Sequence, residues 1–263
     1  MNVILQFDNL SVQYNKAHLA LDCVNLAVPQ GSILAVVGES GSGKSTLIRA
    51  AIDLLPSGGE IVSGRVLYLG DDIARYTPHQ MRKLRGNQIT MIFQDARSSL
   101  NPKRKIGRQF VETLRENSSL SASEARSIST KILGDIGVTN PDRVMGSYTF
   151  ELSGGMCQQI ALAMAISEYT RPKLLLADEP TGSLDATTQA QVIHQMFGYR
   201  ERFGTSIVLV THNFSVAAYI ADHIAVMRGG RIVEWGKRDS VILDPQNEYT
   251  RDLLDAVPRM EVD

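Results

Sequence analysis

Nine consecutive residues in the first fifth of the chain combine glycines with a lysine and two hydroxyl side chains. They read Gly38-Glu39-Ser40-Gly41-Ser42-Gly43-Lys44-Ser45-Thr46 and fit the pattern G-x-x-x-x-G-K-[ST] at every position. Glycines let the backbone wrap until its N–H groups converge on phosphate oxygens. Lys44 would then reach the β- and γ-phosphates, and the Ser45 hydroxyl would hold Mg²⁺. The stretch predicts a phosphate site, and the alternative is a glycine-rich turn with a chance lysine.

The residues on either side of this loop have the required context. Residues 32–37 form a short apolar run rich in β-branched side chains, which is typical of a buried strand. Residues 47–55 are typical of a helix that continues up to Pro56. A strand, a glycine loop and a helix in this order place the loop at the positive end of the helix dipole, where an anion is stabilised.

Acidic side chains follow a second apolar run, at residues 174–177. Asp178 closes this run, and its expected task is to hold Mg²⁺, usually through water. Glu179 comes next and could polarise an attacking water molecule. An acidic pair at a strand end is otherwise often a surface turn, so the interpretation depends on the phosphate loop.

Two further polar residues end apolar strands. His212 follows the run at 206–210 and could contact a γ-phosphate, or it could be a capping or packing residue. Gln94 follows the run at 89–93 and could bind the metal ion or its water. Because the strands that end at these motifs are separated by helices, we expect a mostly parallel sheet with ligands at its carboxyl edge.

A serine and two glycines open another helical run. The stretch Leu152-Ser153-Gly154-Gly155-Met156 precedes residues 158–167 and predicts a second anion-binding helix start, although a serine N-cap followed by flexible glycines is the simpler alternative. A chain with one phosphate loop and a second anion-binding helix start in a separate lobe suggests that two chains share each nucleotide. Cys157 lies in the first turn of this helix, where it is either a reactive thiol or a small buried side chain.

The bulk composition excludes several classes of protein. The chain has 263 residues and a net charge of −1, so nothing indicates a nucleic-acid surface. Its two cysteines indicate neither a disulfide framework nor a zinc site, and we expect a reducing cytosol. We expect no signal peptide, and no apolar run approaches the ~20 residues of a membrane span. Any membrane role must therefore come through partners.

Together these motifs resemble the ATP-binding subunit of an ABC transporter, over essentially the whole chain. The phosphate loop, Gln94, 152–156, 174–179, Ser183-Leu184-Asp185 and His212 occur in the order and at the spacing of that family. The chain is closer still to the peptide/nickel importer subfamily, which it resembles at residues 94–95, 99–102, 148–156, 189–191 and 249–254.

The resemblance implies a fold and a set of ligands. The fold is an α/β P-loop NTPase core with a mostly parallel sheet, an N-terminal antiparallel β portion and an inserted α-helical subdomain. One ABC ATPase domain would fill residues 1–263, with 1–94 and 171–263 as the core and 95–170 as the helical, signature-bearing part. ATP and Mg²⁺ would be the cofactors. The residues implied to bind ATP are the loop 38–46, Tyr14 on the adenine, Ser153, Gly154, Gly155 and Asp185.

The resemblance also implies chemistry and partners. Glu179 would be the catalytic base, with His212, Gln94 and Lys44 as further catalytic groups, while Ser45, Gln94 and Asp178 would hold the metal. Asp185 would face a second ATPase subunit, a distinct paralogue in a head-to-tail dimer. The segment after Gln94 would face two transmembrane permease subunits at the cytoplasmic side of the membrane. An extracytoplasmic solute-binding protein would take part indirectly, and no nucleic acid would bind.

The predicted function is ATP hydrolysis that powers import of peptides, nickel or metal chelates. The alternative is a soluble ABC ATPase that is not coupled to transport; such proteins typically carry tandem modules or long coiled-coil inserts, and this chain shows one module and no heptad run. A nucleotide-gated module without hydrolysis is a third class. The intact Lys44, Asp178, Glu179 and His212 disfavour it.

Three stretches depart from the family pattern. Cys157-Gln158-Gln159 replace residues that are usually arginines in relatives, which could weaken ATP binding at the signature. Asn213 stands where Asp is usual, and Asn247-Glu248 stand where His-Pro is usual. The longer oligopeptide relatives carry a C-terminal extension with a cysteine cluster, which this sequence lacks. We therefore expect a shorter nickel, metal-chelate or dipeptide member.

Overall fold

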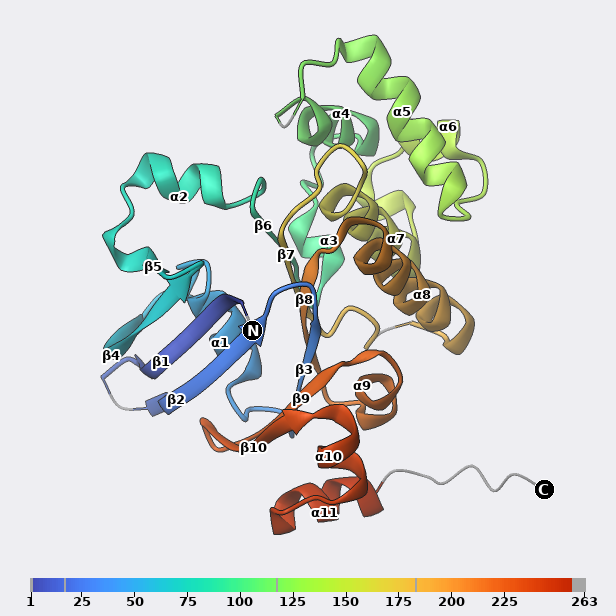
Figure 1. The fold of residues 1–263 in the computed structure, drawn as a ribbon. Coiled ribbons are helices and arrows are strands. Elements are labelled where there is room, and N and C mark those ends of the chain that lie inside the picture. The colour runs from blue at the N-terminus through green and yellow to red at the C-terminus, as the bar shows by residue number, and fades with distance from the viewer. Residues whose placement is uncertain (1, 17, 117, 183, 257–263) are drawn as a thin grey trace, which may run out of the picture. The chain divides into compact units, whose positions relative to one another are not determined.

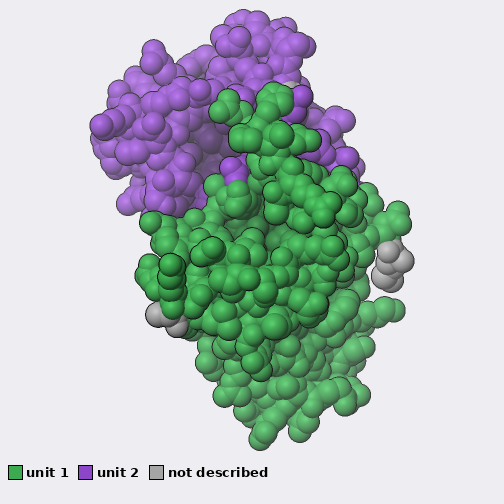
Figure 2. All heavy atoms as spheres, turned by 90° about the vertical axis from the view of Figure 1, so that its left-hand side faces the viewer, with its two compact units in different colours: residues 1–82, 206–263 green, residues 83–205 purple. Residues whose placement is uncertain are grey.

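The computed structural model describes residues 2–16, 18–116, 118–182 and 184–256, which form two compact units (Figure 1). The first unit joins residues 1–82 to residues 206–263, and the second is the continuous stretch 83–205; Figure 2 colours them separately. The first unit is therefore assembled from both ends of the sequence. Within the described ranges, no helix is both long and apolar enough to cross a membrane.

The first unit contains an antiparallel sheet with the strand order β2-β1-β4-β5. Its strands are β1 (Val3–Tyr14), β2 (His18–Pro29), β4 (Gly59–Tyr68) and β5 (Asp71–Asp72). β1 pairs antiparallel with β2 on one side and with β4 on the other. The side chains of Ile4, Leu5 and Phe7 are buried, which supplies this sheet with its apolar core.

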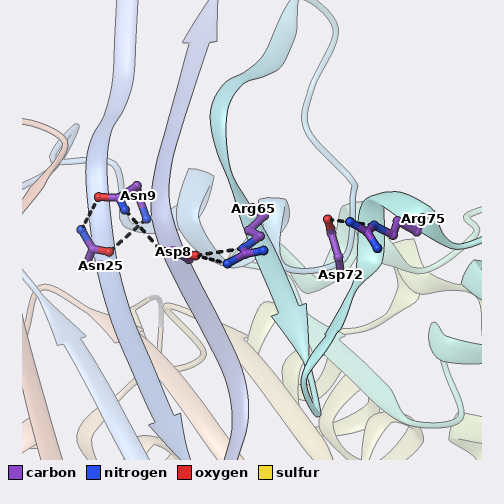
Figure 3. A network of polar contacts seen from close by, with 6 residues as sticks. All are labelled: Asp8, Asn9, Asn25, Arg65, Asp72 and Arg75. Atoms are coloured by element: carbon purple, nitrogen blue, oxygen red, sulfur yellow. Dashed lines mark hydrogen bonds and ion pairs between the residues drawn. The ribbon is translucent and has the colours of Figure 1, made fainter.

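Polar side chains connect the strands of this sheet where β1 bulges (Figure 3). The Asn25 amide of β2 donates to Asn9 Oδ1 at 2.9 Å, and the Arg65 guanidinium of β4 donates to Asp8 Oδ2 at 2.9 Å from Nε. Asn9 has a left-handed backbone, with φ of 49°. A Cβ at Gly64 would lie 2.2 Å from the Asn9 carbonyl oxygen, so only glycine fits there. These contacts hold the register of β1 against both neighbours.

A second sheet of the first unit carries the phosphate loop. β3 (Ile33–Val37) lies between β8 (Ser206–Thr211) and β9 (His223–Arg228) and is parallel to both. β10 (Arg231–Lys237) pairs antiparallel with β9. Every residue of β3 is buried, as a central parallel strand requires. The helices of this unit are α1 (Lys44–Ala50), α9 (Phe214–Ile220), α10 (Arg238–Leu243) and α11 (Glu248–Asp255), with the 3₁₀ turn η1 at Ile73–Arg75.

The helix after the phosphate loop is shorter than its sequence indicates. We expected it to continue to residue 55, but α1 ends at Ala50. Asp53 adopts a left-handed conformation with φ of 51°, and the Leu54 N–H bonds back to the Arg49 carbonyl. A left-handed residue terminates a helix, and the apolar period of the sequence does not reveal it.

The second unit combines two parallel strands with helices. β6 (Ile89–Ile92) and β7 (Leu174–Asp178) pair in parallel. The helices are α3 (Ala96–Ser99), α4 (Ile106–Glu116), α5 (Ala122–Asp135), α6 (Pro141–Gly146), α7 (Gly154–Ala165) and α8 (Ala186–Phe203), with η2 at Thr149–Glu151. α2 (Pro78–Leu84) crosses the boundary between the units at residue 82. The helices pack around a core that includes Phe110, Leu133 and Ile160.

The predicted fold class is confirmed as a mixed α/β protein with an antiparallel N-terminal sheet and parallel strands that carry the motifs. A capping box starts α5, where the Ser121 hydroxyl accepts the Glu124 N–H and the Glu124 carboxylate accepts the Ser121 N–H. The sequence predicted a core of residues 1–94 and 171–263 and a helical part of residues 95–170. Both boundaries of that division lie inside the second unit, and the division stays a prediction.

Candidate nucleotide-binding site

The phosphate loop of the first unit depends on glycine at two positions where the backbone passes close to other chain segments. A Cβ at Gly38 would lie 2.1 Å from the Met227 carbonyl oxygen at the end of β9. Gly43 has φ of 104°, and a Cβ there would lie 2.6 Å from the Ala20 carbonyl oxygen of β2. The loop is thus seated between β2 and β9, and any side chain at either glycine would displace it.

The Lys44 side chain lies inside the loop. It is 5% exposed, and its Nζ donates to the carbonyl oxygens of Gly38 and Glu39, at 2.7 Å each. The Ser42 hydroxyl oxygen lies 3.4 Å from the same nitrogen. Three oxygens of the loop therefore fix the position of a positive charge at the start of α1, where phosphate oxygens would be attracted.

Other predicted residues of the first unit lie at strand ends or at the start of α1. Ser45 and Thr46 are half-buried in the first turn of α1. His212 follows β8 directly and is exposed. Tyr14 ends β1 and is half-buried, with its ring beside the backbone of Gly59. The exposed residues of the loop itself are Glu39, Ser40 and Gly41.

The second unit brings Gln94 and Glu179 together. Gln94 follows β6 and Glu179 follows β7, and these strands run in parallel, so their carboxyl ends meet. The Gln94 amide nitrogen donates to Glu179 Oε2 at 3.2 Å. Asp178, the last residue of β7, is fully buried. Glu179 has φ of 45°, a strained backbone conformation of the kind that clusters at functional sites.

Ser153 starts the signature helix α7 as an N-cap. Its hydroxyl oxygen accepts a hydrogen bond from the Met156 N–H at 3.2 Å, and Gly154 and Gly155 form the first turn. Asp185 caps α8 in the same way, accepting from the Thr188 N–H at 3.0 Å, which holds the pKa of Asp185 below its usual value. Both side chains are N-caps, and the anion-binding role predicted for the start of α7 stays a prediction. Ser183 lies outside the described residues.

Arg97 is a residue that sequence patterns did not reveal. Its Nη2 donates to the Leu152 carbonyl oxygen at 2.6 Å, directly before Ser153. Its own N–H donates to the side chain of Asp95, which caps α3. Arg97 therefore ties the segment after Gln94 to the start of the signature helix. No spacing rule connects two positions 55 residues apart.

Cys157 is the small buried side chain of the two alternatives. It is fully buried, its sulfur lies 3.8 Å from the Thr149 carbonyl oxygen, and burial raises the pKa of its thiol. Its burial and the raised pKa of its thiol favour the small buried side chain over the reactive thiol. Gln159 is also buried, and its amide nitrogen donates to Gln191 at 3.2 Å.

Comparison with known proteins decides the family. The ABC transporter family model matches residues 21–182, which include the phosphate loop, the signature and the acidic pair. The chain belongs to the ABC transporter family. It is 40% identical over 243 residues to the oligopeptide transport ATP-binding protein OppD of Bacillus subtilis, covering 92% of this chain and 67% of the relative. It is 36% identical over 266 residues to the dipeptide transport ATP-binding protein DppD of the same organism, and the match covers 100% of this chain and 79% of the relative.

A solved structure agrees with this assignment. The dimeric structure of MJ0796, a bacterial ABC transporter cassette, superimposes with a TM-score of 0.78 at 25% identity, covering 89% of this chain and 99% of that one. As an ABC protein with these motifs, the chain is an ATPase. The resemblance to the peptide importer subfamily is likewise confirmed by the relatives.

The oxygen donors of the ABC motifs fit Mg²⁺ rather than a softer metal. The predicted ligands are the Ser45 hydroxyl, the Gln94 amide and the buried Asp178 carboxylate. Mg²⁺ in nucleotide sites is held by one or two protein groups together with substrate phosphates, not by a protein cage. In the described part of the chain, no group of three or more His, Cys, Asp or Glu side chains could hold a metal ion.

Proposed function

We propose that the chain is the ATP-hydrolysing subunit of a multi-subunit importer of peptides. The contact of Gln94 with Glu179, at the ends of two parallel strands and beside the buried Asp178, is the observation that supports it most directly. It is the arrangement needed to hold a water molecule against a carboxylate. Relatives named for oligopeptide and dipeptide transport support peptides as the solute. Nickel and metal chelates are the other solutes of the peptide/nickel importer subfamily that the chain resembles.

Each predicted residue has a distinct task in this proposal. The backbone N–H groups of residues 38–46 and the Lys44 ammonium bind the β- and γ-phosphates, while Tyr14 stacks on the adenine. Glu179 accepts a proton from the attacking water as general base. Gln94 orients this carboxylate and the water, and His212 contacts the γ-phosphate.

Mg²⁺, when bound with ATP, neutralises charge that develops on the transferred phosphoryl group. Ser45 and Asp178 would hold it, with Gln94 reaching it directly or through water. The complete burial of Asp178 suits this task, because a carboxylate in a poorly solvated place is stabilised by a cation.

A second ATPase chain completes the site in this proposal. Ser153, Gly154 and Gly155 would bind the γ-phosphate of a nucleotide held by the partner, in a head-to-tail pair that also places Asp185 at the contact. The partner is a distinct paralogue. Both ATPase chains bind two transmembrane permeases at the cytoplasmic face of the membrane, and an extracytoplasmic solute-binding protein delivers the solute to these permeases. The dimeric solved structure of a bacterial cassette supports the pairing.

Reconstitution with the co-purified membrane proteins tests the proposal. We expect ATP-dependent uptake of a labelled peptide into vesicles. If the chain instead co-purifies with no membrane protein and has full ATPase activity, the result would support an ABC ATPase that is not coupled to transport. Ser153→Arg should leave ATP binding by the isolated chain intact and suppress hydrolysis in the complex, because it places bulk where the phosphate must lie. Full hydrolysis by a lone Ser153→Arg chain would overturn the shared site.

A further inference from the structure

The C-terminal helix of the first unit contacts the phosphate loop through one side chain. The Tyr249 hydroxyl of α11 accepts a hydrogen bond from the N–H of Glu39 at 3.3 Å, across 210 residues of sequence. The tyrosine is 5% exposed, so its position is fixed by packing. No motif of the nucleotide site includes this residue.

Glu39 is held from both sides of its backbone. Its N–H donates to Tyr249, and its carbonyl oxygen accepts from the Lys44 ammonium at 2.7 Å. One residue of the loop thus lies between the tyrosine hydroxyl and the charge that is predicted to bind phosphate. The Glu39 N–H shares its peptide plane with the Gly38 carbonyl, which also accepts from the Lys44 ammonium at 2.7 Å. If the N–H lost its acceptor, this peptide could rotate and carry the Gly38 carbonyl away from Lys44.

The tyrosine ring is itself fixed. The Arg228 guanidinium at the end of β9 lies 4.5 Å from the ring centroid, a cation–π contact. Arg228 follows Met227, whose carbonyl oxygen lies against Gly38 at the start of the loop. Burial raises the pKa of Tyr249, so the hydroxyl remains neutral at physiological pH and keeps its hydrogen-bonding geometry.

The start of α11 is anchored to β10. The Glu234 carboxylate accepts the N–H groups of Gln246 at 2.8 Å and Asn247 at 3.1 Å. The Asn247 side chain then caps the helix by accepting the Tyr249 N–H at 3.0 Å. A continuous set of hydrogen bonds therefore runs from β10 through the helix cap to the phosphate loop.

We propose that Tyr249 is a positioning residue for the phosphate loop, and that through Glu39 it sets the orientation of Lys44 and hence the affinity for the β- and γ-phosphates. This inference rests on the proposed role of the loop in binding ATP. The contact on which it depends is a hydrogen bond between a backbone N–H and a neutral hydroxyl, so its effect on affinity is moderate.

Tyr249→Phe removes the hydroxyl and keeps the ring. Loss of one such bond predicts a dissociation constant for ATP that rises roughly three- to tenfold. In the assembled complex, the same change should raise KM for ATP and leave kcat within about twofold, because no group that contacts the attacking water has changed. Tyr219→Phe is the matched control, since Tyr219 lies in α9 of the same unit and is 74% exposed.

A second pair of variants tests the anchor. Asn247→Ala removes the cap and should weaken ATP binding in the same direction, while Asn247→Asp keeps a capping oxygen and should restore most of the affinity. The melting temperature of each nucleotide-free variant is measured beside its affinity. A role in loop position predicts that Tyr249→Phe changes the affinity with a melting temperature close to that of the Tyr219→Phe control. Asn247→Ala should also lower the melting temperature, because it removes a helix cap.

The outcomes separate this inference from the proposed function. If the wild-type chain does not bind ATP, or Lys44→Ala binds it as well as wild type, the proposed function itself fails. If both behave as expected but Tyr249→Phe binds ATP within twofold of the control, only the positioning role is overturned. A loss of affinity in Tyr249→Phe that comes with a lower nucleotide-free melting temperature also overturns it, because it indicates a loss of general stability.

Discussion

Removing the Arg97 guanidinium should weaken the signature side of the site without touching the phosphate loop. Arg97 donates to the Leu152 carbonyl oxygen at 2.6 Å, and the next residue, Ser153, is the N-cap that is proposed to meet the partner's γ-phosphate. Arg97→Met keeps an unbranched apolar side chain and removes every donor. The start of α7 then loses this hydrogen bond to α3.

The size of the effect follows from the type of bond. A hydrogen bond from a charged donor contributes roughly 1.5–3 kcal/mol. Because the Arg97 side chain is exposed, the lower value applies, which corresponds to about a tenfold change in an equilibrium constant. Arg97→Lys keeps the charge but loses the planar fork, so its effect should lie between those of wild type and methionine.

ATP-driven pairing with the partner ATPase, in the Glu179→Gln background, measures this effect directly. Hydrolysis is suppressed there and the membrane subunits are absent, so any contact of Arg97 with a permease cannot contribute. The ATP concentration for half-maximal pairing, read by light scattering, should rise about tenfold. The control is Arg126→Met, which changes an exposed arginine on α5 of the same unit.

ATP affinity and thermal stability of the unpaired chain complete the test. The ATP affinity should remain near that of the control, since the proposed contact involves only a nucleotide held by the partner. The melting temperature should fall by no more than the loss of one hydrogen bond explains. Pairing of the Arg97→Met chain within twofold of the control would refute the reasoning, and so would an equal loss of ATP affinity in the unpaired chain.

Three more outcomes are expected. Glu179→Gln should bind ATP normally and lose turnover by at least ~10²–10⁴-fold, and steady-state hydrolysis within a few-fold of wild type would contradict the assignment of the base. Iodoacetamide should label the exposed Cys23 in the native chain and reach the buried Cys157 only in urea, as mass spectrometry would show, because burial raises the pKa of that thiol and excludes the reagent; equal labelling of both would refute it. Gly43→Ala should destabilise the chain by at least about 1–2 kcal/mol in urea unfolding, because its Cβ would lie 2.6 Å from Ala20 O, whereas Gly41→Ala meets nothing within 4 Å and should cost less.

Sequence patterns predicted the parts of this site that depend on local order. The loop 38–46 contains glycines at the two positions where the backbone passes closest to other segments, and Ser153 begins a helix through a contact three residues away. Strand ends carry Gln94 and Glu179, and parallel pairing brings them together. Each of these follows from short-range geometry.

The remaining features depend on contacts that no local pattern specifies. The end of α1 is set by the left-handed Asp53, which the apolar period does not show. The helix N-terminus at Cys157 indicates a reactive thiol, but tertiary packing buries it. Arg97 and Tyr249 act through partners that are distant in sequence, so only the folded chain reveals what they contact.

The discontinuous first unit has a consequence for synthesis of the chain. β3 emerges from the ribosome early, yet both of its neighbours, β8 and β9, begin only after residue 205. At typical elongation rates of ~5–20 residues per second, about 170 residues of separation keep both edges of this wholly apolar strand without partners for roughly 10–30 s. Residues 83–205 are contiguous and can fold during that delay. A nascent chain that stalls before residue 206 therefore exposes the strand that leads into the phosphate loop. We expect a chaperone to bind this apolar strand at that stage and prevent its aggregation.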